Sequence, residues 1–449
     1  MKKILIIVTI LILVLILIFN LKNIYKVLPL EKKVSIKNFI LKKYENLSDE
    51  SKILIRVLKL EPFKQLQVRY KRQNPSINNL NNDYNVKFLP NTQTEKLSLK
   101  KIKINFKKQT IQRNNSGYGF FKPFYIELFK EYLLIVNHNG EILFIGLDEL
   151  FDLSEKVKQF KNIKTNLGIQ GGKNSKIMGT LIYDKKIFIS HLSYENNCQK
   201  YNISHANINF ENLIFENFFK SESCGENLNA GRMKVFNFNG SNGLLATIGG
   251  EKLNQPTDKP QNKNSDIGKI IFIDFKNKKK EIFSIGHRNP QGLFVQDNII
   301  IATEHGPKGG DEINKIEFGK NYGWPIASYG TAYQHVKKNK NKKYLKNHLS
   351  NNFEEPIFSF VPSIGISEII KIPNKFSQSW DNNFLLSSLN GGSLYRIRFD
   401  SKFEKIIFIE KIFINRRIRD LKYLDKYNSI LLALEDWKEI GILRKIDSQ

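Results

Sequence analysis

The segment YLLIVNHNGEILFI, residues 132–145, carries two short apolar and β-branched runs on either side of Asn139-Gly140. An Asn-Gly dipeptide readily supplies the two positive φ angles of a type I′ hairpin turn. We therefore predict an antiparallel hairpin whose strands are residues 132–136 and 142–145.

The same pattern of paired apolar runs recurs further along the chain. The clearest pairs are 181–183 with 187–189, 293–295 with 299–302, and 384–389 with 394–399. Such spacing without long helical patterns predicts an all-β architecture over residues 84–449 that closes on itself to hide its strand edges. A β-propeller meets this requirement, and a large sandwich or a solenoid is the alternative. Because no WD or kelch repeat is present, the number of blades does not follow from the pattern.

The first 27 residues have the character of an export signal. Lys2 and Lys3 precede an apolar run, residues 4–19, that only Thr9 interrupts. No processing site of small residues follows, so we predict an uncleaved transmembrane anchor at 1–27, with the chain beyond it exported. A cleaved signal is the alternative. Residence at an inner membrane, with the folded domain in the periplasm or otherwise exported, follows from this expectation.

Residues 28–83 differ from the rest because their apolar residues recur at helical spacing among many lysines and glutamates. We predict a short, basic helical stalk here. The polar stretch NPSINNLNNDYN, residues 74–85, contains helix-breaking signals and marks the boundary with the β domain.

Composition limits the class of partner. The chain has 449 residues and a formal net charge of +28, but its lysines are spread along the sequence. No nucleic-acid-binding signature accompanies them, so we predict no nucleic-acid partner. The 41% of hydrophobic residues supply a large core, which excludes wholesale disorder.

Cys198 and Cys224 are the only cysteines in the chain. In an exported protein an even number of cysteines favours a disulfide bond, and we predict one here. Two unpaired thiols are the alternative, because sequence does not give the distance between the two residues.

Three polar segments carry a resemblance to a known family. They are GHRNPQG at 286–292, TEHGPKGGDEIN at 303–314 and NYGWP at 321–325. In this order and spacing they closely resemble the soluble quinoprotein sugar dehydrogenases, the glucose and sorbosone dehydrogenase family. The resemblance is strongest over residues 227–330 and continues loosely through RRIRD at 416–420. It implies a six-bladed β-propeller that uses pyrroloquinoline quinone (PQQ) and calcium.

The resemblance also implies which residues hold these groups. PQQ is a tricarboxylate, and guanidinium groups are suited to bind its carboxylates. The implied cofactor-binding residues are Arg288, Asn289, Arg417, Arg419 and Trp324. The backbone carbonyls of Gly306 and Pro307 are the implied calcium ligands. Trp324 and its neighbour Tyr322 either border the bound ring or simply pack the turn.

Two positions depart from the family pattern. The family has a general-base histidine four residues before the arginine of a G-R-L/M segment, and here Leu228 takes that place. The family also has a cofactor-pairing lysine where this chain has Asn390. Three alternatives follow: a local gap moves another group into place, His191 or His305 supplies the base from a neighbouring loop, or the reaction is no longer alcohol or aldose oxidation. His305 is the best substitute base. If Leu228 marks the base position, Leu228→His is expected to raise turnover.

Two functional hypotheses follow. The first is an exported, membrane-tethered, PQQ-dependent oxidoreductase acting on sugars (aldoses) or related alcohols. The second is a catalytically impaired propeller of the same family that binds a saccharide or a surface partner. Motifs of other enzyme classes, H-E-x-x-H, the P-loop and G-x-S-x-G, are absent from the sequence.

Overall fold

The computed structural model describes residues 87–89, 95–106, 123–152, 154, 157–172, 175–250, 257–333 and 343–446. The predicted anchor at 1–27, the predicted stalk at 28–83 and its boundary at 74–85 all lie outside these residues, so they stay predictions. None of the helices in the described ranges is long and apolar enough to cross a membrane.

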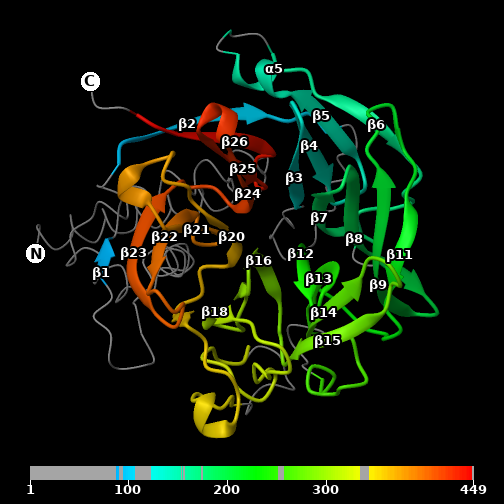
Figure 1. The fold of residues 1–449 in the computed structure, drawn as a ribbon, viewed down its shortest axis with the longest axis vertical. Coiled ribbons are helices and arrows are strands. Elements are labelled where there is room, and N and C mark those ends of the chain that lie inside the picture. Colours follow the sequence, from blue (N-terminus) through cyan, green and yellow to red (C-terminus); the bar gives the residue numbers. More distant parts are fainter. Residues whose placement is uncertain are drawn as a thin grey trace, which may run out of the picture. The chain divides into compact units, whose positions relative to one another are not determined.

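Six β-sheets follow one another in the sequence and are arranged around a common axis (Figure 1). Blade 1 contains β3 (Phe124–Phe129), β4 (Tyr132–Asn137), β5 (Ile142–Gly146) and β6 (Lys161–Thr165), and blade 2 contains β7 (Ile177–Tyr183), β8 (Lys186–Glu195), β9 (Cys198–Asn207) and β11 (Glu216–Lys220). Blade 3 contains β12 (Ala230–Phe238), β13 (Ser241–Ile248), β14 (Lys269–Asp274) and β15 (Lys280–Ile285), and blade 4 contains β16 (Pro290–Gln296), β17 (Ile299–Glu304), β18 (Asp311–Lys315) and β19 (Phe358–Phe360). Blade 5 contains β20 (Ile366–Lys371), β21 (Phe384–Ser388), β22 (Ser393–Phe399) and β23 (Ile406–Phe413), and blade 6 contains β24 (Ile418–Leu424), β25 (Ser429–Leu434), β26 (Glu439–Lys445) and β2 (Leu97–Lys103).

The innermost strand of each blade packs against the innermost strands of its two neighbours. Around the ring their order is β3, β7, β12, β16, β20 and β24, and β24 packs on β3. This arrangement is a six-bladed β-propeller, which confirms the predicted fold and decides against a sandwich or a solenoid. The short elements between strands are α5 (Leu147–Phe151) and the 3-10 turns η2 (Leu349–Asn351), η3 (Gln378–Trp380) and η4 (Asp425–Tyr427).

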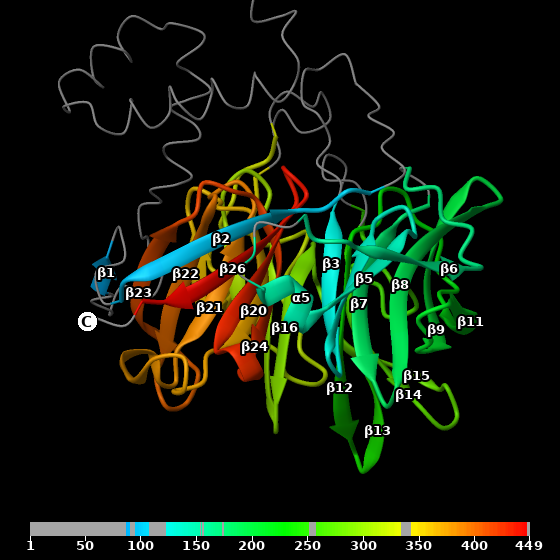
Figure 2. The ribbon, with the colours of Figure 1, turned by 90° about the horizontal axis from the view of Figure 1, so that it is seen from above.

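Blade 6 is built from both ends of the domain, and this closes the ring. β2 pairs antiparallel with β26, from Leu97 opposite Lys445 to Lys103 opposite Glu439 (Figure 2). Two short strands lengthen other blades at their outer edges, where β1 (Lys87–Leu89) runs parallel to β23 and β10 (Asn212–Leu213) runs parallel to β6.

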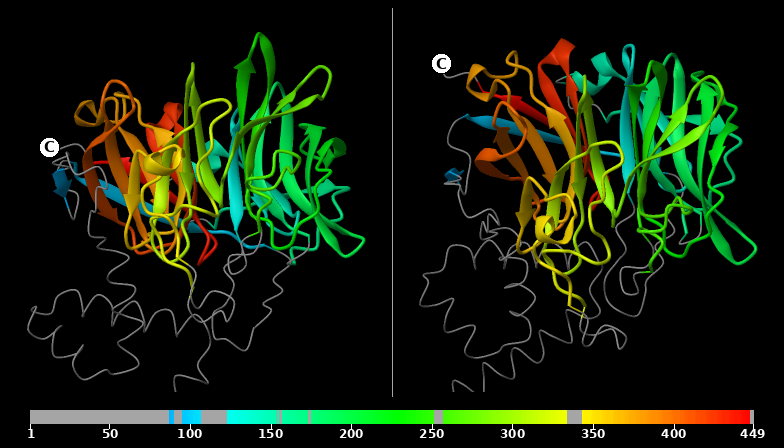
Figure 3. Two further views of the ribbon diagram at one scale, coloured as in Figure 1. Left: turned by 90° about the horizontal axis from the view of Figure 1, so that it is seen from below. Right: turned by 60° about the horizontal axis from the view of Figure 1, so that its bottom comes forward.

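Neighbouring blades lie face to face around the axis (Figure 3). A hydrophobic cluster lies at each of the six interfaces between neighbouring blades, and a small seventh cluster contains Trp324, Ala332 and Tyr344. Most blades are covered on both faces, so their middle strands are apolar throughout instead of alternating. All six residues of β14 and of β25 are buried. Packing of whole sheets therefore explains why the sequence shows short apolar runs separated by turns.

The turn in the hairpin that opened the sequence analysis differs from the prediction. β4 and β5 do form the predicted antiparallel hairpin. However, Gly140 has φ +83° while Asn139 has no positive φ, and the Gly140 N–H donates to the Asn137 carbonyl (3.0 Å). The type I′ assignment was therefore wrong, because the loop is longer than two residues and needs the left-handed conformation only at glycine.

Two-residue turns with both φ angles positive occur elsewhere. They are Asp184-Lys185, Asn196-Asn197 and Asn239-Gly240, each of which directly joins two adjacent strands. The first two contain no glycine. Asn and Asp tolerate the left-handed region better than other residues, but Lys185 adopts it without that advantage.

Cys198 and Cys224 form a disulfide bond, with 5.6 Å between their Cα atoms. Cys198 begins β9, and Cys224 lies in the loop that leads to β12. The N–H groups of Gln199 and Gly225 each donate to the other residue's carbonyl, so backbone pairing continues directly beside the bridge. The structure therefore contains the predicted bond, which attaches this loop to blade 2.

Candidate functional site

The inner strands all begin at the same end of the propeller axis. Hydrogen bonds between neighbouring inner strands join residues that stand at the same place along each strand. The fourth residue of β7, Thr180, donates to the fourth residue of β3, Glu127 (2.9 Å), and the third residues of β3 and β24, Ile126 and Asp420, are joined at 3.1 Å. The residues directly before the six inner strands are Pro123, Lys176, Asn229, Asn289, Gly365 and Arg417. Most of the predicted cofactor ligands belong to these strand starts, so this end of the axis is the candidate site.

Arg288 lies just before β16 with its guanidinium group buried. Nη1 donates to the His305 carbonyl (2.5 Å), and the group lies over the Trp324 ring, 5.2 Å from its centroid. Nε and Nη2 are buried and have no hydrogen-bond partner. Burial lowers the pKa of Arg288 below the usual arginine value. A buried cation with two unused donors is suited to bind an anionic ligand such as a carboxylate.

Glu304, the last residue of β17, fixes the backbone on which Arg288 stands. Its Oε1 accepts the N–H groups of Arg288 and Asn289, the latter at 3.0 Å. Its Oε2 lies 3.1 Å from His287 Nδ1, and His287 Nε2 lies 2.8 Å from the Ser284 hydroxyl. The buried Glu304 carboxylate and His287 imidazole therefore hold the backbone of residues 287–289 in place.

His305, the substitute base suggested by the sequence, has both ring nitrogens engaged. Nε2 lies 2.5 Å from the Ile366 carbonyl oxygen, so it must carry the proton. Nδ1 then accepts a hydrogen bond from the Asn289 amide (3.3 Å). Burial lowers the pKa of His305 to about 4, which leaves the ring neutral at pH 7. This geometry favours a positioning role toward Asn289, and the role of base stays a prediction.

His191, the second substitute, lies on β8 opposite Ile177. Its Nε2 lies 2.9 Å from the Ser204 hydroxyl, and burial lowers its pKa to about 4. Neither contact reaches Arg288 or the arginines of blade 6.

Asp311 connects the predicted calcium loop to the start of β20. Its Oδ1 accepts the Gly306 N–H (3.1 Å), while Oδ2 accepts the N–H groups of Gly365 (2.6 Å) and Ile366 (3.0 Å). Three backbone donors occupy this carboxylate. Asp311 therefore shapes the loop.

The carbonyl groups of Gly306 and Pro307 are the predicted calcium ligands. A Cβ atom at residue 306 would collide with the Gly310 carbonyl, so the tight loop requires glycine there. The Pro307 carbonyl accepts a hydrogen bond from the Tyr333 hydroxyl (3.1 Å). Among the described residues no group of three or more His, Cys, Asp or Glu side chains could hold a metal ion. Because calcium takes six to eight oxygen ligands, two carbonyls form only part of a coordination shell.

Arg417 and Arg419 share one buried carboxylate. Their Nε atoms donate to Oε1 and Oε2 of Glu435, each at 2.7 Å. Burial would raise the pKa of Glu435, but Arg419 and Arg417 outweigh it and hold the pKa below its usual value. The Asn390 carbonyl oxygen accepts from Arg417 Nη1 (2.6 Å), and the Gln291 carbonyl oxygen accepts from Arg419 Nη1 (2.7 Å). The structure thus brings together two predicted cofactor arginines and the departing position Asn390.

Leu228 does not face these arginines. Its side chain is fully buried in the core cluster between blades 2 and 3, with Met178 and Ile267. Its N–H donates to Gln199 Oε1 (2.8 Å), and a Cβ on Gly225 would lie 2.5 Å from Leu228 Cδ2. The structure therefore argues against the expectation that Leu228→His would raise turnover, because an imidazole there would enter an apolar cluster.

The two aromatic residues of NYGWP have different surroundings. Tyr322 stacks on His287, with ring centroids 4.7 Å apart, and its hydroxyl donates to the Lys315 carbonyl (2.6 Å), so it packs the turn. Trp324 is 3% exposed, and its Nε1 is buried without a hydrogen-bond partner. Through its contact with Arg288, Trp324 stays a candidate site residue.

Three site residues were missed at the level of sequence. Glu435 and Gln291 orient the blade 6 arginines, and Arg232 on β12 supports both groups from the axis. Arg232 donates to the carbonyl groups of Gln291 and Arg419, each at 2.7 Å. Gln291 and Arg232 do lie inside recognised motifs, whereas Glu435 has only the signal of a carboxylate directly after the apolar run of β25.

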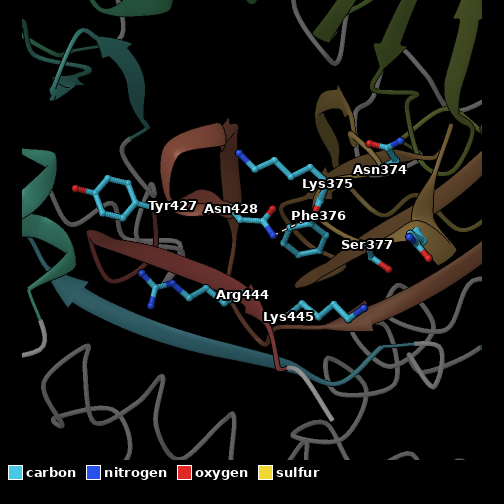
Figure 4. A pocket seen from close by; sticks show the side chains of 9 residues that line it. Asn374, Lys375, Phe376, Ser377, Tyr427, Asn428, Arg444 and Lys445 are labelled. Atoms are coloured by element: carbon cyan, nitrogen blue, oxygen red, sulfur yellow. Dashed lines mark hydrogen bonds between the residues drawn. The ribbon is translucent and has the colours of Figure 1, made fainter. Parts of the chain in front are cut away.

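A cavity of about 640 Å³ lies elsewhere, at the far ends of β20 and β24 (Figure 4). Its lining consists of Asn374, Lys375, Phe376, Ser377, Gln378, Tyr427, Asn428, Arg444 and Lys445. It contains none of the predicted site residues. Its cations are partly compensated, since Lys375 pairs with Asp425 (3.1 Å) and Lys445 with Glu95 (3.2 Å).

A six-bladed propeller with the predicted cofactor arginines Arg288, Arg417 and Arg419 at one end of its axis agrees with the sugar dehydrogenase resemblance. The chain belongs to the Glucose / Sorbosone dehydrogenase family, whose sequence model matches residues 121–444.

Two curated relatives carry names that describe an activity. The aldose sugar dehydrogenase YliI of Escherichia coli is 31% identical over 200 residues, covering 41% of this chain and 52% of the relative. The quinoprotein glucose dehydrogenase B of Acinetobacter calcoaceticus is 29% identical over 167 residues, covering 26% of this chain and 35% of the relative. The chain thus spans about half or less of the length of the curated relatives it matches.

Solved structures show the same fold. The apo form of the soluble aldose sugar dehydrogenase of Escherichia coli aligns with a TM-score of 0.61 at 18% identity, covering 73% of this chain and 96% of that one. The PQQ-bound form of the aldose sugar dehydrogenase of Streptomyces coelicolor aligns with a TM-score of 0.54 at 18% identity, covering 79% and 100%.

Proposed function

We propose that the protein is an exported, membrane-tethered, PQQ-dependent oxidoreductase that acts on sugars (aldoses) or related alcohols. Family membership and the names of the relatives support this proposal. The observation that carries it is Arg288, whose buried Nε and Nη2 have no partner. Such donors are costly to leave unpaired, and the carboxylates of PQQ would satisfy them.

The residues at this end of the axis fit a flat polyanion. Arg288 and the Asn289 amide would bind it from blade 4, while Arg417 and Arg419 would bind it from blade 6. Glu435 keeps the latter two guanidinium groups in place through their Nε atoms. When bound, the quinone would accept the two electrons and the hydrogen removed from the alcohol carbon.

The carbonyl groups of Gly306 and Pro307 are the proposed calcium ligands, with further oxygens to come from the bound cofactor. Asp311 holds this loop in shape through the Gly306 N–H. Each carbonyl oxygen has two lone pairs, so the Tyr333 hydrogen bond to Pro307 leaves one for a metal ion.

A specific observation favours the second candidate, a catalytically impaired propeller that binds a saccharide or a surface partner. Leu228 is buried in the core, and both nitrogens of His305 are engaged. The predicted substitute base His305 then has no free lone pair beside Arg288, so proton removal from the sugar by this residue would be slow.

Reconstitution of the purified full-length protein separates the two candidates. PQQ is added with calcium or with a chelator, binding is measured first, and dye reduction with a panel of aldoses second. We expect binding that requires calcium. Binding with dye reduction supports the dehydrogenase, binding without turnover supports the impaired propeller, and no binding with calcium contradicts the site itself. Tight binding in the presence of the chelator would show that the calcium assignment is wrong.

The proposed tether is tested separately. Because residues 4–19 are apolar and no processing site follows, the chain should stay in the membrane pellet after high salt and carbonate, with its first residues intact. Release of a shortened chain would contradict the anchor.

A further inference from the structure

Lys176 lies directly before β7, at the entrance to the axis. Its carbonyl accepts the N–H of Leu192 (3.0 Å), and the next residue, Ile177, donates its N–H to the His138 carbonyl (2.9 Å). Backbone hydrogen bonds to β8 and to the β4–β5 turn therefore fix the backbone at this lysine. In blade 2 it occupies the position that Asn289 has in blade 4 and Arg417 in blade 6.

The ammonium group of Lys176 has no hydrogen bond and no anionic partner among the described residues. Burial, and after it the charge of Arg419, lower the pKa of Lys176 to about 8. The carboxylates on the strands packed against β7 are Glu127 on β3 and Glu195 on β8, and each pairs with another lysine, Lys422 (2.9 Å) and Lys220 (2.6 Å) respectively. The other titratable groups nearby are His138 from the β4–β5 turn, His191 on β8, and Arg232 and Lys234 on β12, and none of these carries a negative charge. A half-buried cation close to another cation is unfavourable unless an anion joins them.

On the blade 5 side of the site, one cation that the family pattern contains is missing. Asn390, where the family has a lysine, binds Arg417 through its carbonyl oxygen (2.6 Å) and contributes no charge. Glu435 pairs with both Arg417 and Arg419. The positive charge that a lysine at position 390 would supply is therefore absent, and Lys176 offers a positive charge from blade 2 instead.

We propose that Lys176 binds a carboxylate of the quinone cofactor and supplies the positive charge that Asn390 does not. This inference rests on the proposed function and names a residue of that same site. Lys176 approaches from blade 2, on the side of Arg419, so the cofactor would be held by cations from three blades.

The proposal predicts a pH dependence with a definite sign. Below about pH 8 Lys176 is protonated and attracts the carboxylate, and above it the attraction is lost. Cofactor affinity should therefore fall as pH rises from 7 to 9.5. Binding should also raise the pKa of Lys176, so the protein should take up a fraction of a proton at pH 8.

The experiment measures PQQ binding by calorimetry on the full-length protein with calcium, from pH 6.5 to 9.5, in buffers of different ionisation enthalpy. We expect Lys176→Met to weaken binding about tenfold or more at pH 7, as for loss of a charge-assisted hydrogen bond. It should also abolish the fall above pH 8 and the proton uptake. Lys176→Arg should keep the affinity and move the fall to higher pH.

Two further variants serve as rescue and control. Adding Asn390→Lys to Lys176→Met should restore most of the affinity, because it returns a cation to the family position. Lys185→Met, an exposed lysine at the far end of β7, is the matched control and should leave binding unchanged. Wild-type affinity in Lys176→Met, or an equal loss in Lys185→Met, overturns this role alone. Wild-type protein that binds no PQQ at any pH overturns the proposed function and this role with it.

Discussion

Arg288 combines a full charge, burial and two unpaired donors, and this combination makes it the most informative single residue of the site. Arg288→Ala should weaken PQQ binding by about 1.5–3 kcal/mol, or about ten- to 150-fold, for loss of hydrogen bonds to a charged group. Titration of the bound quinone by its absorbance provides the measurement.

Arg416→Ala is the matched control for Arg288→Ala. The guanidinium group of Arg416 pairs with Glu439 (3.3 Å), lies over the Trp437 ring and donates to the Asn415 carbonyl (3.0 Å), instead of binding Glu435 as Arg417 and Arg419 do. Equal weakening in both variants would indicate a general effect of lost positive charge and would contradict a specific contact by Arg288.

Glu312 gives a prediction on stability. Burial, and after it the nearby Glu304, raise its pKa well above the usual value, so the folded protein keeps this carboxyl protonated where the unfolded chain ionises it. Burial of Glu312 does not lower the free energy of unfolding at pH 4, where the carboxyl is protonated in both states. As pH rises, the folded state binds more protons than the unfolded state, so the free energy of unfolding falls. Glu312→Gln removes this group and should raise the melting temperature at pH 8 but leave it unchanged at pH 4.

Glu354→Gln controls for loss of a carboxylate as such. Glu354 is partly exposed and pairs with Lys320 (2.9 Å), so its replacement should have little effect at either pH. A stabilisation by Glu312→Gln that is the same at pH 4 and pH 8 would contradict ionisation as its cause.

Leu228 illustrates how one residue can occupy a motif position without facing the site. Leu228→His buries an imidazole in an apolar cluster and should cost about 1–3 kcal/mol of stability without raising turnover. Leu228→Met keeps the volume and apolar character and should cost less than about 1.5 kcal/mol. Chemical denaturation measures both, and a Leu228→His protein with wild-type stability and faster sugar oxidation would return this position to the role of base.

At the scale of elements, the disulfide attaches the loop before β12 to β9. Its half-cystines are 26 residues apart, and closing a loop of this length contributes about 3 kcal/mol on the chain-entropy estimate. Cys198→Ser should lower the free energy of unfolding by about this amount. Mass spectrometry without reduction should find the two cysteine peptides linked in the wild type.

A double variant isolates the contribution of the bridge. If both cysteines act through one bond, Cys198→Ser with Cys224→Ser should cost about as much as Cys198→Ser alone. Additive losses would show that each cysteine contributes by its own packing instead.

At the scale of the whole molecule, β2 closes the ring because it completes blade 6 by pairing with β26. Ile104, just after β2, is 1% exposed in the core cluster between blades 6 and 1. Ile104→Ala should cost about 2–5 kcal/mol, as for a truncated core side chain. Lys101→Ala changes an exposed residue of the same strand and should be nearly neutral, so a melting-temperature comparison of the two tests whether β2 is an integral part of blade 6.

The axis of the propeller is occupied by an ion network built from third residues of the inner strands. Arg232 Nη1 lies 3.0 Å from both Glu368 and Asp420. Arg232 also donates to the carbonyl groups of Gln291 and Arg419, so the network supports the site directly above it. Loss of Glu368 or Asp420 would leave the buried charge of Arg232 only partly compensated, which is unfavourable in the interior.

The sequence by itself determined the strands, the closed all-β class and the two loops of blade 4. Apolar runs and turn residues are local signals, and GHRNPQG and the predicted calcium loop also contain contacts that form within blade 4. Glu304 reaches Arg288 over only 16 residues, and the Gly306–Asp311 contact spans five. Such short-range pairs are already encoded in the motif.

Only the tertiary structure decided what meets across the axis. Gln291 contacts Arg419 over 128 residues, and Arg232 contacts Asp420 over 188. The inward or outward direction of Leu228, the carboxylate shared by the blade 6 arginines and the solitary Lys176 depend on the same assembly. These features arise because closing the ring brings the starts of six inner strands together, and no local pattern records which of their side chains will then lie side by side.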